Sequence, residues 1–195
     1  MFRLFLLISL ASFVVSEIPE ITIYSGPNQS GNSFTVQTKE ADLTNWGFFL
    51  GTAKSYKIKG GWWDFFEGKD YTQHKHTAGS GVYSNSTSNF DWSGIKSLRY
   101  IGPPDTSIPA VSFYEVTDVK GHREKREMVV LGSSGTANNF PFAPNGIIIN
   151  TFGFSKWTIY QNNDFTGKSV CLDGHWNEVN THFSGFPFLS VKFGC

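Results

Sequence analysis

The stretch Trp157-Thr-Ile-Tyr160-Gln-Asn-Asn-Asp-Phe165-Thr-Gly167-Lys-Ser-Val-Cys-Leu172 decides the fold of this chain. Apolar and polar residues alternate up to the aromatic Tyr160, which is typical of a half-buried β-strand. A second ring follows at Phe165. Gly167 supplies a backbone conformation that residues with a Cβ atom adopt only at a cost, and its missing side chain lets a ring lie over the backbone. The stretch therefore predicts a β-hairpin whose turn closes onto its own sheet.

The same pattern occurs four times, at intervals of about 45 residues, which is the size of one supersecondary unit. The first aromatic, the second bulky position and the glycine position are Tyr24/Gln29/Gly31, Phe66/Tyr71/Gln73, Tyr114/Val119/Gly121 and Tyr160/Phe165/Gly167. Gln73 replaces the glycine in the second copy, where a left-handed backbone costs such a residue on the order of 1 kcal/mol. We therefore expect the second hairpin to deviate most.

The rest of the chain also has the character of an all-β protein. Short alternating runs such as Ile21–Tyr24 and Val111–Tyr114 are separated by turn residues, and the chain holds 20 glycines. The segment Gly102–Pro109 contains three prolines and no strand pattern, so it predicts an extended linker. The predicted domains are residues 17–102 and 110–195, joined by the linker 103–109, with two repeats in each domain.

The repeats resemble the Greek-key motif of the βγ-crystallin superfamily. The resemblance extends beyond the hairpins to Gly81–Tyr83 and Ser97–Tyr100 in the second repeat, and to Asp173–Trp176 and Leu189–Val191 in the fourth. It implies an all-β protein with two βγ-crystallin-like Greek-key β-sandwich domains, each built from two motifs.

Residues 1–16 predict a secretory signal peptide. Arg3 precedes the apolar run Leu4–Val15, which is too short to cross a bilayer, and cleavage after Ser16 fits the small-residue preference. We therefore expect a soluble extracellular protein with no transmembrane segment. Export also favours a disulfide between Cys171 and Cys195 over the alternative of two free thiols.

The charge balance excludes some partners. The 16 basic residues include Arg3, so the mature chain has 15 against 16 acidic residues, a net charge of −1. A near-neutral chain without a basic stripe has no electrostatic footprint for nucleic acid or anionic lipid.

Metal sites are not expected. Calcium-binding relatives carry two Asn or Asp residues, two variable residues and then Ser/Thr-Ser just before the closing strand. The corresponding stretches 51–55, 92–97, 143–148 and 185–190 lack the paired Asn or Asp. Weak calcium candidates are Asp91 and Asn145. His74 and His76 lie two apart and would share one face of a strand, but the favoured interpretation is a pair of solvated histidines. No cofactor is expected.

Enzymatic chemistry and processing have little support. The sequence contains neither a nucleophile elbow nor a His-Glu-x-x-His motif, so we expect no enzyme. The run Arg123-Glu-Lys-Arg126 matches the recognition sequence of secretory proprotein convertases, but a solvated hairpin end explains it more simply. Asn28 and Asn85 begin N-glycosylation sequons and are predicted glycan sites.

These features favour a secreted, non-enzymatic structural or binding protein of the extracellular space, whose partner is an unidentified extracellular protein or surface. The alternative is a secreted defence or venom effector, either a membrane-active toxin or its partner subunit, with Gly60–Phe66 as a contact patch unless those rings fill the core. The third hypothesis is a protease inhibitor. The linker permits a monomer or a domain-paired dimer.

Overall fold

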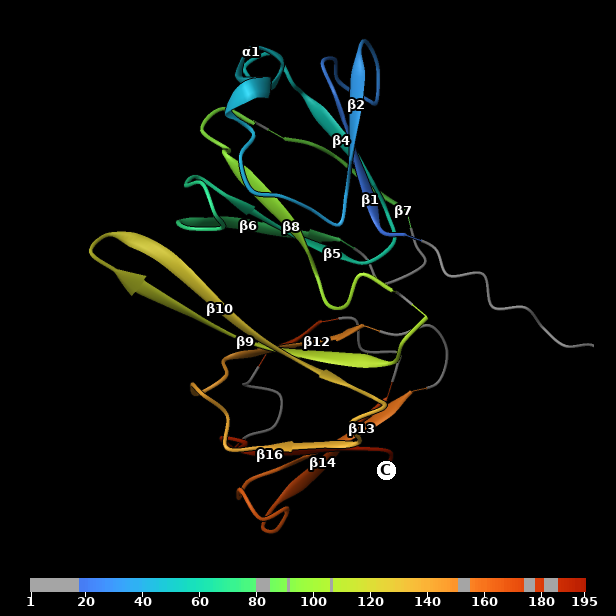
Figure 1. The fold of residues 1–195 in the computed structure, drawn as a ribbon, viewed down its shortest axis with the longest axis vertical. Coiled ribbons are helices and arrows are strands. Elements are labelled where there is room, and N and C mark those ends of the chain that lie inside the picture. The colour runs from blue at the N-terminus through green and yellow to red at the C-terminus, as the bar shows by residue number, and fades with distance from the viewer. Residues whose placement is uncertain are drawn as a thin grey trace, which may run out of the picture.

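The computed structural model describes residues 18–79, 85–90, 92–105, 107–150, 155–173, 178–180 and 186–195. Within them the chain forms short β-strands in four antiparallel sheets, one 3-10 turn and one short helix. The sheets are stacked along the long axis of the molecule as two sandwiches (Figure 1). The predicted all-β fold is confirmed, while the predicted signal peptide and its cleavage site lie outside the described residues.

The first sandwich consists of the sheets β2-β1-β4-β7 and β3-β8-β5-β6. Its elements are β1 (Glu20–Tyr24), β2 (Ser33–Gln37), β3 (Lys39–Glu40), η1 (Thr44–Trp46), α1 (Gly47–Leu50), β4 (Ser55–Lys59), β5 (Trp62–Phe66), β6 (His74–Gly79), β7 (Asn85–Asn89) and β8 (Ser97–Ile101).

The second sandwich consists of the sheets β10-β9-β12-β15 and β11-β16-β13-β14. Its strands are β9 (Ala110–Val119), β10 (His122–Leu131), β11 (Thr136–Asn138), β12 (Gly146–Asn150), β13 (Lys156–Tyr160), β14 (Ser169–Asp173), β15 (Glu178–Asn180) and β16 (Ser190–Phe193).

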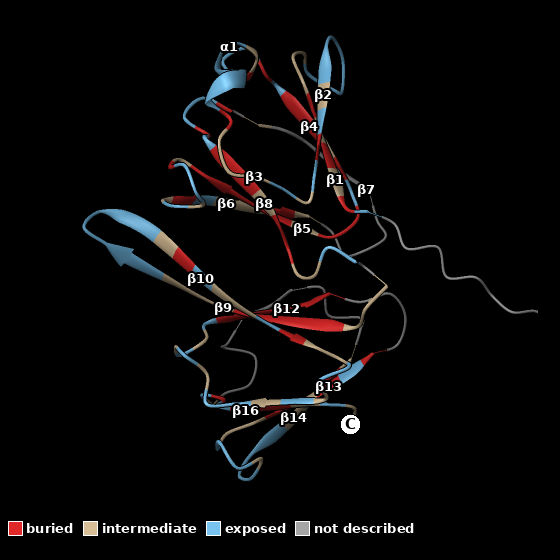
Figure 2. Ribbon diagram, viewed as in Figure 1, coloured by how far each residue is buried: buried red, intermediate tan, exposed pale blue. Residues whose placement is uncertain are grey.

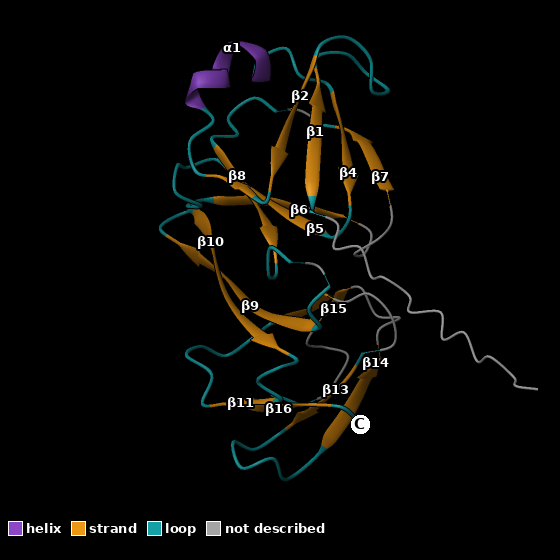
Figure 3. Cartoon of the chain, turned by 45° about the vertical axis from the view of Figure 1, so that its right-hand side comes forward, coloured by secondary structure: helices purple, strands orange, loops and turns teal. Residues whose placement is uncertain are grey.

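The two motifs of each sandwich exchange strands. In every motif the third strand leaves the sheet of its neighbours and joins the other sheet: β3 pairs with β8, β7 with β4, β11 with β16 and β15 with β12. This exchange is the Greek-key connection, and it makes each sandwich depend on both of its motifs. Figure 3 shows the two sandwiches from the side, with α1 at the far end of the first.

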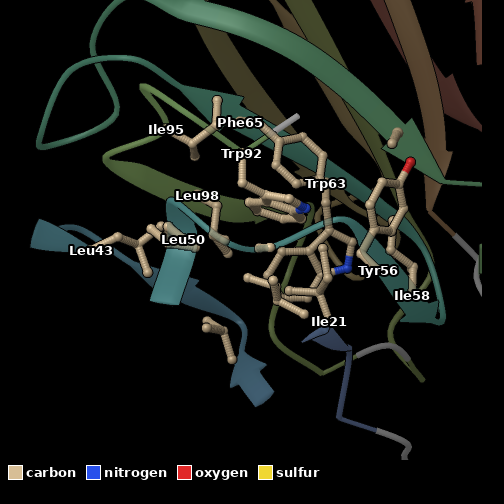
Figure 4. Packing of buried hydrophobic residues seen from close by; sticks show 14 of the residues in the cluster. Ile21, Leu43, Leu50, Tyr56, Ile58, Trp63, Phe65, Trp92, Ile95 and Leu98 are labelled. Atoms are coloured by element: carbon tan, nitrogen blue, oxygen red, sulfur yellow. The ribbon is translucent and has the colours of Figure 1, made fainter. Parts of the chain in front are cut away.

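Each sandwich has its own aromatic and aliphatic core. In the first core Trp63 and Trp92 are fully buried, and Phe65 contacts Trp92 edge to face at 5.2 Å between ring centroids (Figure 4). The run Gly60–Phe66 therefore fills the interior, and its alternative interpretation as an exposed contact patch is wrong. The reason is that alternate rings of β5 point to opposite faces, and both faces are covered.

The glycines of the hairpin turns have the predicted backbone but lie in solvent. Gly31, Gly121 and Gly167 have φ angles of 79°, 82° and 81°, in the left-handed region that favours glycine. All three are exposed, and they lie in turns beyond the ends of their strands. The glycines therefore act through backbone conformation and not through buried packing.

A serine at the start of the closing strand holds three of the four hairpins. The Ser55 hydroxyl donates to the Gly26 carbonyl at 2.7 Å and accepts from the Gln29 N–H at 2.9 Å. Ser97 makes the same pair of bonds in the second motif, and Ser190 donates to the Asn162 carbonyl in the fourth. These bonds satisfy backbone groups of the turns and tie each turn to its sheet.

The third hairpin is different, because Gly146 occupies the serine position opposite Tyr114. Gly146 has no hydroxyl to tie the turn down, and β9 and β10 pair over ten residues as a long ribbon. The end of this ribbon, with Gly121 in its turn, is exposed and projects beside the first sandwich (Figure 2).

The prediction that the second hairpin deviates most is therefore only partly right. Gln73 does hold the left-handed backbone of the missing glycine, with φ at 57°. The strain is accompanied by a register shift in the β5–β6 pair, where Phe65 faces His76 but Phe66 faces His74. The larger departure is the open third hairpin, which the sequence pattern did not predict.

The facing sheets of the two sandwiches are buried on both sides. Phe66 and Ile101 from the first sandwich, and Ala110 and Ile148 from the second, are fully buried but belong to neither core. Their side chains point out of their own sandwich, where solvent would otherwise lie. The two sandwiches are therefore packed against each other through β5 and β8 on one side and β9 and β12 on the other.

Candidate functional site

Buried charged side chains gather where the two sandwiches meet. Asp64 on β5 is fully buried, and its Oδ1 atom accepts hydrogen bonds from the Lys125 ammonium at 2.7 Å and the Thr77 hydroxyl at 2.6 Å. The His74 Nε2 atom lies 3.2 Å from the same oxygen. Lys125 belongs to β10 of the second sandwich, so this ion pair joins the two halves of the chain.

A second ion pair lies beside the first. The Arg99 guanidinium on β8 donates to the Glu127 carboxylate on β10, and its other terminal nitrogen is 3.8 Å from Asp64 Oδ2. Asp64, His74, Thr77, Arg99, Lys125 and Glu127 are called the interface cluster below.

The electrostatics of the interface cluster favour a charged Asp64. Burial raises the pKa of this carboxyl, but Lys125, His74 and Arg99 outweigh the burial and hold the pKa well below its usual range. Lys125 also lies over the Tyr114 ring, with its Nζ atom 4.2 Å from the ring centroid. The carboxylate is therefore ionised at neutral pH and is compensated across the interface.

The interface cluster corrects two sequence predictions. His74 is not solvated: it is buried and faces the Asp64 carboxylate, which stands ten positions earlier in the sequence. The basic run from Arg123 is not simply a solvated hairpin end either, because the side chain of Lys125 is 1% exposed. The cause in both cases is the contact between the sandwiches, which period-two patterning does not reveal.

The sequence carried one signal for this site, namely an aspartate inside the apolar run Trp62–Phe66. A carboxylate between large rings on a strand must face either solvent or a buried cation. The cation came from Lys125 in the other half of the chain, and strand patterning alone does not identify so distant a partner.

His76 lies beside the cluster without joining its ion pairs. Its ring stacks on Phe90 with centroids 5.3 Å apart. Burial and the neighbouring His74 lower its pKa against the opposite influence of Asp64. In the described part of the chain, no three His, Cys, Asp or Glu side chains are grouped so that they could hold a metal ion.

The calcium candidates have different positions. Asn145 uses its side-chain amide to pair with the Val116 backbone, accepting from the N–H and donating to the carbonyl, each at 2.9 Å. This explains an Asn at the position as an anchor of the β9 strand. Asp91 lies outside the described residues, and the expectation that no calcium binds stays a prediction.

The modification sites are placed in part. Asn28 is exposed in the β1–β2 turn, and Asn85 begins β7. Their glycosylation stays a prediction. The predicted disulfide between Cys171 and Cys195 is confirmed, with an S–S distance of 2.09 Å, and it ties the C-terminus to β14.

Large apolar side chains are exposed at the end of the first sandwich farthest from the interface. Phe48 is 93% exposed and Trp46 is 45% exposed, both on the short segment formed by η1 and α1. The Trp46 ring stacks on Phe34 with centroids 4.5 Å apart, and Phe34 contacts Phe49 edge to face. These four residues, Phe34, Trp46, Phe48 and Phe49, are called the aromatic tip below.

Comparison with known proteins agrees with this architecture. A sequence model of the Beta/Gamma crystallin family matches residues 20–101, the region of the first two motifs. No curated protein matches the sequence. Among solved structures, the chain is similar to geodin, a beta-gamma crystallin from Geodia cydonium, with a TM-score of 0.58 and 14% identity over 91% of this chain and 100% of that one.

No helix among the described residues is both long and apolar enough to span a membrane. The predicted resemblance is confirmed by the family match, the fold and the strand exchange together. Residues 20–101 are a βγ-crystallin domain, and the chain as a whole has the βγ-crystallin fold.

Proposed function

We propose that this protein is a secreted, non-catalytic βγ-crystallin-like protein that works as one rigid body and binds an extracellular partner. Its parts are a signal peptide at residues 1–16, a first domain at 17–102, a linker at 103–109 and a second domain at 110–195. The observation that carries the proposal is the ion pair between Asp64 and Lys125, which is buried between the two sandwiches.

The Asp64–Lys125 pair supports a rigid arrangement because separating the two sandwiches would cost free energy. Moving the sandwiches apart would leave Asp64 and Lys125 without each other, and would also expose Phe66, Ile101 and Ile148. Water would hydrate both charges after separation, so the cost of separation comes mainly from exposing these apolar side chains. Flexible tethering through the linker is therefore disfavoured, and the two sandwiches present their outer surfaces in a fixed relation.

The interface cluster also supports a non-catalytic role. Its titratable groups are engaged with one another between packed sheets, and the Asp64 carboxylate is held ionised by structural partners. Catalytic acids and bases instead need a pKa near the working pH and access to substrate. The lowered pKa of Asp64 therefore has a structural explanation.

Secretion is tested by expressing the full chain in cultured animal cells. The proposal predicts that the protein accumulates in the medium, begins at Glu17 by N-terminal sequencing and contains no titratable thiol before reduction. A mass decrease on treatment with peptide N-glycosidase would show N-glycans, for which Asn28 and Asn85 are the predicted sites. Retention in the cytosol with two reactive thiols would contradict the proposal.

A further inference from the structure

The aromatic tip is an apolar protrusion of the first sandwich. Phe48 lies on a four-residue helix that begins at Gly47 and is followed by Gly51, and its ring is almost fully exposed. A single exposed ring is ordinary, but here Trp46 is also exposed and is backed by Phe34 and Phe49. Contiguous exposed apolar surface of this kind marks an interaction site.

A shallow groove extends the apolar surface beside α1. Its lining includes the apolar side chains of Leu43, Leu50, Trp92 and Ile95. Among the described lining residues Lys96 is the one with a charged side chain, and it is exposed. The groove therefore combines apolar walls with a positive rim.

Exposed lysines and a carboxylate paired with another lysine lie near the aromatic tip in the described part of the chain. Lys54 is exposed and follows α1 in the sequence. Asp42, the carboxylate that precedes η1, is 2.7 Å from the Lys69 ammonium and also accepts from the Thr44 hydroxyl. The Lys69 hydrogen bond and those from Thr44 lower the pKa of Asp42 to about 2. Asp42 is paired with Lys69, so it supplies no counter-charge to Lys54 or Lys96.

We propose that the aromatic tip docks into the interfacial region of an anionic phospholipid bilayer. Trp and Phe side chains partition favourably at the boundary between headgroups and acyl chains, and lysines beside them attract anionic lipids. The chain as a whole is near-neutral, but the exposed Lys54 and Lys96 supply local positive charge to such headgroups, which favours this partner over a neutral surface.

This inference names the partner of the proposed binding protein and rests on that role. A ring that passes from water into the interface contributes on the order of tenfold to hundredfold in partitioning. The small number of exposed rings on a folded sandwich therefore yields reversible binding rather than insertion.

The test is co-sedimentation of the secreted full-length protein with phosphatidylcholine vesicles, prepared with and without phosphatidylserine, before and after glycan removal. We expect binding to the phosphatidylserine vesicles, and a decrease of about tenfold or more in partitioning for Phe48→Asp. Phe48 makes so little contact that this variant should keep the wild-type unfolding midpoint.

The matched control is Val119→Asp, which changes an exposed apolar residue at the end of the β9–β10 ribbon. It should bind vesicles like wild type. The inference is overturned if wild type stays in the supernatant, or if Phe48→Asp sediments like wild type. It is also overturned if Phe48→Asp converts a wild-type dimer to a monomer in analytical ultracentrifugation, because a second copy would then cover the tip. None of these results affects the secretion test above.

Discussion

Replacing Lys125 by methionine removes one ammonium group from the interface and keeps a side chain of similar length. In wild type this group lies 2.7 Å from Asp64 Oδ1 and 3.2 Å from the Thr77 hydroxyl, and both charged side chains are at most 1% exposed. Removing one partner of a buried pair typically costs about 3 to 5 kcal/mol, because the other charge is left uncompensated. His74 and Arg99 stay near Asp64, so we expect the lower half of that range.

The assay is urea unfolding of the full chain followed by tryptophan fluorescence. Arg126→Met is the control, since it removes the next basic residue of the same strand, whose side chain is 61% exposed and pairs with Glu115. Such exposed pairs contribute at most about 1 kcal/mol. In the double variant Asp64→Asn/Lys125→Met, the two losses should fall short of additivity. Equal losses from Lys125→Met and Arg126→Met would refute the reasoning.

Three further predictions concern other parts of the molecule. Reducing the Cys171–Cys195 disulfide, whose sequence separation is 24, should lower the unfolding free energy by about 3 kcal/mol, measured as the difference between urea midpoints with and without reductant. Gly146→Ser should destabilise the fold by about 1 to 3 kcal/mol and should not restore a closed third hairpin, because the serine Cβ atom would lie 2.0 Å from the Tyr114 ring. An unchanged midpoint of thermal unfolding would contradict this prediction. The lowered pKa of His76 favours its neutral form in the folded state, so its contribution to stability is present above its unfolded pKa of about 6.5 and is lost as the pH falls below it. His76→Gln should flatten the dependence of stability on pH between about 7 and 5, and a parallel curve would contradict this.

The fold could be predicted because its determinants are local. The aromatic and glycine positions of each hairpin, such as Tyr160 and Gly167, act within one turn, and the alternating strands show which face is buried. The open third hairpin was missed although its signal was present. Gly146 stands where Ser55, Ser97 and Ser190 begin the other closing strands, and the hydroxyl that ties the turn is lost with it.

The interface cluster could not be predicted in the same way, because its members come from distant segments. Asp64 and Lys125 are 61 positions apart, and their pairing depends on how two finished sandwiches pack. Patterning of β5 alone shows an aspartate between rings but does not say what lies opposite. The aromatic tip was missed for a related reason: Phe48 and Trp46 look like core residues in the sequence, and their exposure depends on how the connection between β3 and β4 folds.

Differential scanning calorimetry of the full chain at neutral pH tests most directly whether the two sandwiches act as one rigid body. If the buried ion pair and the doubly buried sheets couple them, the protein will unfold in one transition whose calorimetric and van't Hoff enthalpies agree. Two resolved transitions, or a calorimetric enthalpy near twice the van't Hoff value, would show that the sandwiches unfold independently and would contradict the account.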